Sequence, residues 1–173
     1  MPQTLRYRVN SLYDPNIATA LEQPIAGFAE LAAMYTSYRV HAAKMSVRAE
    51  SASGSVPTLA VCTLANQNNF PSTYLQTLAS IGNPYTVWDM MGLGVGASGL
   101  TLENYCKMDK LAGTKNISTD MGYSSAVTTN PVYQLYGFVT MSPTFATGAG
   151  YSVAIVIEIE FWAEFFGREV EFS

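Results

Sequence analysis

The chain has 173 residues, of which 49% are hydrophobic and only 13% are charged, and its formal net charge is −4. The apolar fraction excludes a disordered chain, and the negative charge argues against a freestanding nucleic-acid binder, which normally carries a basic excess. Soluble domains usually carry about 25% charged residues. The low charge therefore predicts that much of the surface is buried against other subunits.

The length suits one domain with a real core. The sequence contains no repeat, low-complexity block or linker, so residues 1–173 are predicted to form a single domain. No apolar run approaches the ~20 residues needed to cross a bilayer, and the N-terminus lacks the pattern of a signal peptide. Cys62 and Cys106 have neither metal-ligand spacing nor the density of a disulfide scaffold, so we expect two buried free thiols.

Alternating side chains predict a first strand at 4–13. The Asp-Pro-Asn run at 14–16 ends this strand, because proline fixes φ and lacks a backbone donor. A connection of about two dozen residues follows, far longer than a tight hairpin needs, and it carries a short helical pattern over 28–35. The next strand is predicted at 38–50, before a turn of small residues at 51–55.

The middle of the chain continues this pattern. A nearly all-apolar strand is predicted at 56–64 and a helix with one apolar face at 71–81. Periodicity alone leaves 100–111 open between helix and strand, and the alternation of its side chains favours a strand. Other strands are predicted at 85–91, 123–127 and 133–141, with a glycine-rich loop at 92–99, a loop at 113–119 and a turn at 142–150.

The last strand is the strongest signal in the sequence. Strict alternation over 153–165 is longer than the usual strand of about 5–6 residues, so this strand needs a large sheet or a partner subunit. One face would carry Val153, Ile155, Ile157, Ile159, Phe161, Ala163 and Phe165.

Eight strands, with helices only inside two connections and no β-α-β rhythm, predict an all-β fold. Eight antiparallel strands in two packed sheets form a jelly-roll sandwich, with short helices after the first and third strands. An up-and-down barrel is the structural alternative. Its connections should be short throughout, whereas those at 14–37 and 65–84 are long.

No catalytic constellation is present. His41 is the only histidine, so a multi-histidine metal site cannot form, and no oriented partner marks it as a catalytic base. The glycine-rich run at 92–97 lacks both the Walker lysine and the G-x-G-x-x-G spacing inside a β-α-β unit, and no G-x-S-x-G elbow occurs. We therefore expect neither an enzyme nor a metal or cofactor.

The carboxylates of the last strand suggest a charge pairing. In a jelly roll the first and last strands are expected to be neighbours, so Arg6 and Arg8 are predicted to pair with Glu158 and Glu160, because like charges on one face repel. The alternative for basic side chains on the first two strands is contact with nucleic-acid phosphates, without reading of the base sequence. The candidates for either role are Arg6, Arg8, Arg39 and Lys44.

Tyrosines flank the long opening connection, and tyrosine suits interfaces because it combines an apolar body with a polar tip. This connection is therefore predicted to form a subunit contact rather than a catalytic loop. The candidate contact residues are Asp14, Gln23, Phe28, Tyr35 and Tyr38.

The opening stretch carries an ordered set of motifs: a strand, N-S-x-x-D-P, Q-P-x-x-G-F, a helix and Y-x-x-Y-R-V. The motif residues are Asn10, Ser11, Asp14, Pro15, Gln23, Pro24, Gly27, Phe28, Tyr35, Tyr38, Arg39 and Val40. This order resembles the start of single-jelly-roll capsid proteins of small icosahedral viruses, whose second motif, Q-P-x-G-F, is one residue shorter. The likeness is to capsid proteins of circular single-stranded DNA viruses, with tombusvirus-like shell domains as relatives.

The resemblance implies a coat protein of the virion, made and assembled in a host cell. Such a protein would associate with at least about 60 copies of itself in an icosahedral shell, around a single-stranded nucleic acid that it binds without sequence specificity, and without a membrane. The family commonly begins with an arginine- and lysine-rich arm, whereas this sequence begins MPQTLRYR, directly at a strand. No protruding domain is expected after the last strand.

A jelly-roll carbohydrate-binding module is the alternative function. It would use Trp88, Trp162 or tyrosines as stacking platforms for sugar rings. Size separates the two functions, because a binding module stays a monomer or small oligomer, whereas a shell protein forms megadalton particles.

Overall fold

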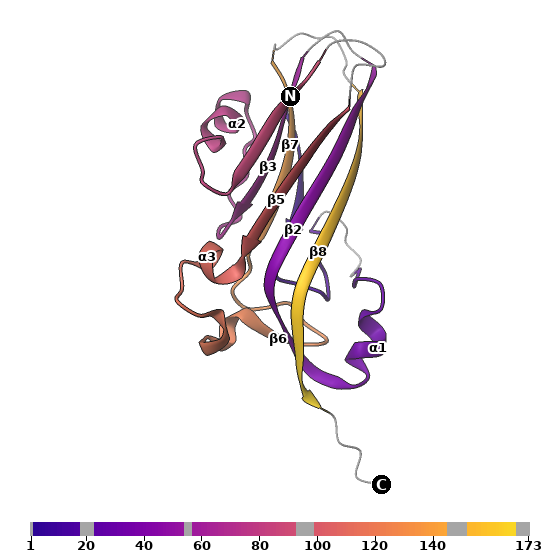
Figure 1. Ribbon diagram of the computed structural model, residues 1–173, viewed down its shortest axis with the longest axis vertical. Coiled ribbons are helices and arrows are strands. Elements are labelled where there is room, and N and C mark those ends of the chain that lie inside the picture. The colour runs from indigo at the N-terminus through magenta and orange to yellow at the C-terminus, as the bar shows by residue number, and fades with distance from the viewer. Residues whose placement is uncertain (1, 18–22, 54–56, 93–98, 145–151, 169–173) are drawn as a thin grey trace.

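Two antiparallel β-sheets packed face to face form the body of the molecule in the computed structural model (Figure 1). The structure describes residues 2–17, 23–53, 57–92, 99–144 and 152–168. The strands are β1 (Gln3–Arg8), β2 (Tyr35–Ser53), β3 (Thr58–Ala65), β4 (Thr86–Met91), β5 (Leu100–Lys107), β6 (Ser124–Ala126), β7 (Tyr136–Pro143) and β8 (Ser152–Arg168). The helices are α1 (Phe28–Ala32), α2 (Tyr74–Ser80) and α3 (Met108–Ala112), with the 3-10 turns η1 (Ile117–Thr119) and η2 (Met121–Tyr123).

One sheet has the strand order β1-β7-β3-β4, and the other has β2 between β5 and β8. The three-residue β6 pairs with β2 beyond the end of β5, on the same side of β2. All of these pairs are antiparallel, and the chain passes repeatedly from one sheet to the other. The predicted all-β jelly-roll sandwich is therefore confirmed.

The core lies between the two sheets. The side chains that β2 turns inward are almost completely buried, as the exposed fractions of Met45 (0%), Val47 (0%) and Ala49 (1%) show. Gly137 of β7 lies against the side chains of Met45 and Val9, and a Cβ at this position would collide with both. Burial in this core raises the pKa of the Cys62 thiol to about 12. Both cysteines are buried and free, as predicted.

Several boundaries differ from the prediction. The first strand ends at Arg8 because the next residues turn into the interior, where Asn10 is fully buried. The strand predicted at 100–111 ends at Lys107 and continues as α3, which buries two side chains three positions apart and ends at Gly113 with φ 71°. The second strand begins at Tyr35 and extends to Ser53, into the predicted turn. Most of the predicted loops at 92–99 and 142–150 lies outside the described residues.

The prediction that the first and last strands are neighbours is wrong. β7 lies beside β1, and β8 pairs with β2 along its length. At one side of the sandwich β5 contacts β4 and β3, so β1 and β8 lie at the opposite side, in different sheets. Within the described part of the chain, no helix is long and apolar enough to cross a membrane.

Candidate functional site

The N-S-x-x-D-P motif builds a buried polar network. The Asn10 amide donates to the Tyr133 carbonyl (2.8 Å) and accepts from the Leu135 backbone N–H (2.8 Å). Ser11 donates to the Asn130 side chain (2.5 Å). Because Asn10 and Ser11 are fully buried, these bonds replace the water that their polar groups would otherwise need. The motif thus fixes the segment that leads into β7.

Arg8 joins the same network from its outer side. Its guanidinium donates to the Asp14 carboxylate (2.7 Å), to the Asp14 backbone carbonyl (3.0 Å) and to the Gln134 side chain (3.0 Å). Arg6 instead lies over the ring of Phe70, 4.7 Å from its centroid. The predicted pairing of Arg6 and Arg8 with Glu158 and Glu160 is wrong, because β1 and β8 belong to different sheets.

The interface candidates divide into buried and accessible residues. Phe28 is 3% exposed and Tyr38 0% exposed, and their rings pack edge to face at 5.5 Å. Tyr38 donates to the carbonyl of Thr129 (3.0 Å), and burial raises its pKa above the usual value. Neither Phe28 nor Tyr38 can therefore contact another subunit in this conformation, which corrects that prediction.

The other three candidates remain accessible to different degrees. Asp14 is half-buried and bound to Arg8, and Tyr35 is half-buried beside Phe165, with ring centroids 5.9 Å apart. Gln23 is exposed. Among the candidates that the structure describes, Gln23 and the accessible parts of Asp14 and Tyr35 are therefore available to a partner.

The outer face of β2, β5 and β8 carries a ladder of ion pairs. Lys44 on β2 lies 3.0 Å from Glu103 of β5 and 3.7 Å from Glu160 of β8. Hydrogen bonding to Glu103 raises the pKa of Lys44 above its usual value. These carboxylates neutralise the cation, which weakens its case as a phosphate ligand.

The same face continues toward the bulge of β2. Arg39 contacts the carboxylate of Glu164 at 2.9 Å, and His41 lies 3.2 Å from the same oxygen. His41 lies where the register of β2 against β8 shifts, between Val40 and Ala42. Arg39 and Lys44 are thus held in cross-strand pairs. Among the described residues, no group of three or more His, Cys, Asp or Glu side chains could hold a metal ion.

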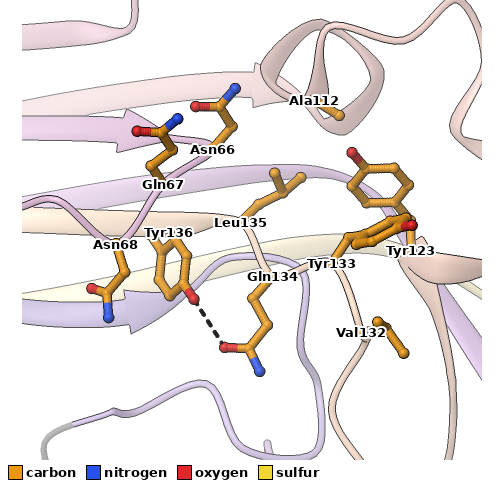
Figure 2. Close-up of a pocket in the computed structure, with 10 residues that line it drawn as sticks. All are labelled: Asn66, Gln67, Asn68, Ala112, Tyr123, Val132, Tyr133, Gln134, Leu135 and Tyr136. Carbon is orange, nitrogen blue, oxygen red and sulfur yellow. Dashed lines mark hydrogen bonds between the residues drawn. The ribbon is translucent and has the colours of Figure 1, made fainter.

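A pocket of about 420 Å³ lies beside the segment that enters β7 (Figure 2). The ring centroids of Tyr123 and Tyr133 lie 5.3 Å apart. The Tyr136 hydroxyl donates to the Gln134 amide oxygen (3.2 Å). Burial raises the pKa of Tyr123. Among the described residues, the lining holds no carboxylate, cation or thiol, and consists of Asn66, Gln67, Asn68, Ala112, Tyr123, Val132, Tyr133, Gln134, Leu135 and Tyr136. Such a lining offers hydrogen bonds and aromatic faces, but no acid–base pair for catalysis.

Exposed apolar side chains mark the outer face of the β1-β7-β3-β4 sheet. The predicted apolar face of the helix at 71–81 points largely outward, because α2 buries Thr77 and leaves Leu75 75% exposed. Trp88 and Met90 on β4 are each 49% exposed. The spacing of Leu75 and Leu78 signalled an apolar face, but periodicity does not say whether the chain's own core covers it. Neither the exposure of these side chains nor the amide-lined pocket was predicted from the sequence.

No protein-family model matches the chain, and no curated protein matches it. One similar solved structure is a T=1 subviral particle of a Penaeus vannamei nodavirus capsid protein deletion mutant, with 8% identity and a TM-score of 0.48, covering 95% of this chain and 83% of that chain. Another is sacbrood virus of honeybee in expansion state II, with 13% identity and a TM-score of 0.45, covering 98% and 97% of the two chains. With TM-scores below 0.5, these likenesses add nothing to a fold that the strand order itself defines.

Proposed function

We propose that this chain is a viral capsid protein, a single jelly-roll domain that assembles with copies of itself into an icosahedral shell. The observation that carries the proposal is apolar surface left open on a chain with few charges. Leu75, Trp88 and Met90 are exposed outside the core, while only 13% of the residues are charged. Tryptophan and methionine are enriched in subunit interfaces, which bury side chains of this kind.

The buried motif supports the same function in another way. Asn10 and Ser11 hold the segment that enters β7 in one conformation, and Arg8 anchors the opening connection through Asp14. A shell needs loops of fixed shape, because each loop must fit the same contact in every copy. The residues that carry the likeness to capsid proteins are thus mostly those that set the shape of the subunit.

In this proposal the shell belongs to a virion assembled in a host cell, and it encloses a single-stranded genome, DNA by the resemblance. Arg39 and Lys44 already bind carboxylates of their own protomer. We therefore expect weak contact with nucleic acid that does not depend on base sequence. The Arg6 guanidinium lies over the Phe70 ring and is the candidate for such a contact.

Sedimentation velocity tests the proposal on the full chain. A shell of about 60 copies of an 18.8 kDa chain sediments as a particle of about 1.1 MDa. The double variant L75S/W88S should shift the material toward monomers and small oligomers. The matched control E30A/K115A changes two exposed polar side chains and should leave the particles intact. Monomeric wild-type protein under all assembly conditions would overturn the proposal.

A carbohydrate-binding module is the second candidate, favoured by the amide- and tyrosine-lined pocket of Figure 2. Neutral sugars are bound by such side chains, and Tyr133 offers a ring that is 52% exposed. Binding of a glycan by a monomeric protein, lost in Tyr133→Ala, would favour this function. Megadalton particles that bind no glycan would exclude it.

A further inference from the structure

The strand β8 has an open edge. It pairs with β2 from Tyr35 opposite Arg168 to Ser53 opposite Ser152, and no other strand pairs with it among the described residues. Figure 1 shows β8 as the outermost strand of its sheet, beside β2. The free edge of a 17-residue strand presents a long row of backbone donors and acceptors that can pair with an added strand.

The inner face of β8 is incompletely covered. Ile155, Ile157 and Ile159 stand opposite Ala49, Val47 and Met45 of β2, and so point toward the same core. The β2 partners are at most 1% exposed, whereas the three isoleucines are only half-buried. The apolar side chains of β8 are thus less covered than those of the neighbouring β2, because β8 lies at the edge of its sheet.

The facing sheet is open at the same side. Leu5 of β1 is in register with Val139 of β7, so both point inward, yet Leu5 is 37% exposed and Val139 only 1%. In the part of the chain that the structure describes, the β1 sheet has four full strands and the β8 sheet three, because the short β6 lies on the β5 side of β2. One further strand beside β8 would cover Leu5 and the isoleucines together.

Charge indicates which strand fits. The outer face of β8 carries exposed Glu158 and Glu160, and Lys44 is the only cation that forms an ion pair with either of them in the described part of the chain. A second β8 in antiparallel pairing centred on Ile159 would place Glu158 of one copy opposite Glu160 of the other, which is unfavourable. Lysine or arginine on the added strand would instead meet both carboxylates.

We propose that the open edge of β8 binds an extended segment of about eight to ten residues in which apolar and basic side chains alternate. The segment adds as an antiparallel strand, with its apolar side chains over Leu5 and the isoleucines and its basic side chains beside Glu158 and Glu160. This inference rests on the sheet edge and does not depend on the proposed capsid function.

A synthetic ten-residue peptide of alternating valine and lysine tests the proposal with the full-length protein. We expect saturable binding by fluorescence anisotropy, and slower hydrogen exchange at alternate backbone amides of 153–161. Two controls are a peptide with the same residues in two blocks and an alternating valine–glutamate peptide, and both should bind at least about tenfold more weakly.

Charge reversal on the protein supplies the matched test. E158K/E160K should weaken binding of the lysine peptide about tenfold and strengthen binding of the glutamate peptide. The control E30K/D89K makes the same change in net charge at exposed sites on α1 and β4 and should leave the preference unchanged.

Three results would overturn the proposal. The first is failure of the lysine peptide to bind, and the second is equal binding of all three peptides to the wild-type protein. The third is protection of the β8 edge in a peptide-free sample, which would show that a second copy already covers it. The first two use only wild-type protein, so they stand even if the charge-reversal variant fails to fold.

Discussion

The polar groups of this sandwich fall into two regions that differ in depth. Asn10 and Ser11 are completely buried and each binds a partner far along the chain. Lys44, on the outer face of β2, binds Glu103 and Glu160 at the surface. A buried polar group that loses its partner lowers the stability of the fold far more than an exposed one, because the exposed group can hydrogen-bond to water instead. The hydrogen bonds of Asn10 and Ser11 therefore stabilise the fold, whereas the ion pairs of Lys44 contribute little to its stability.

The largest effect is expected for Asn10→Ala. It leaves the Leu135 N–H and the Tyr133 carbonyl without their partner in a buried site, so the free energy of unfolding should fall by about 3 kcal/mol. Urea denaturation followed by tryptophan fluorescence measures the change. Asn116→Ala is the control, because it removes only an exposed capping bond to the Ser118 N–H, and should cost about 1 kcal/mol or less. Equal losses of unfolding free energy in Asn10→Ala and Asn116→Ala would contradict the claim that buried hydrogen bonds stabilise this fold more than exposed ones.

Tyr38→Phe should have an intermediate effect. It removes the hydroxyl that donates to Thr129 but keeps the ring packed against Phe28, so we expect a loss of about 1–2 kcal/mol. Tyr105→Phe, at a ring that is 53% exposed, serves as control and should leave the unfolding midpoint unchanged. An unchanged free energy of unfolding in Tyr38→Phe would mean that the buried hydroxyl adds nothing to stability.

The buried thiol predicts the response to alkaline pH. The pKa of Cys62 is about 12 in the folded chain, above the usual value of 9.0. The unfolded chain therefore releases this proton first, so stability is fully present below pH 9 and declines toward pH 12. At pH 10 the loss should be about 1 kcal/mol. The slope of unfolding free energy against pH should flatten in Cys62→Val, and an unchanged slope would contradict the burial of this thiol.

The smallest effect is expected for Lys44→Ala. Both of its ion pairs are at the surface, so the change in unfolding free energy should be less than that of Tyr38→Phe and should vanish in high salt. Thermal unfolding at low and high ionic strength measures the change. A salt-independent loss of unfolding free energy as large as that of Asn10→Ala would show that the ion pairs of Lys44 stabilise the fold as strongly as the buried hydrogen bonds.

Alternation predicted the faces of the strands correctly but not their neighbours. The inward side of β8 follows from period two, because Ile157 and Ile159 can only lie on one face. That β2 and not β1 lies beside β8 depends on contacts between distant segments, which alternation does not encode. The jelly-roll class was therefore predictable, whereas the neighbour of β8 was not, and the predicted pairing of Arg6 with Glu158 and Glu160 is wrong for that reason.

The buried motif shows a second limit of sequence reasoning. Alternation placed Asn10 and Ser11 in the first strand, and nothing in their spacing indicates that Asn130 and Leu135 will satisfy their hydrogen bonds. Phe28 and Tyr38 were predicted at a subunit interface for a related reason, because an aromatic side chain suits a core and an interface equally well. Only the fold shows which surface each residue faces.

Electron microscopy of the purified full-length chain under assembly conditions tests the shell most directly. Negative staining should show uniform closed particles whose mass, by light scattering of the same sample, is about 1.1 MDa for about 60 copies of the 18.8 kDa chain, or a larger closed shell. A field of monomers, or open aggregates without a defined size, at every salt concentration and pH tried would contradict the account.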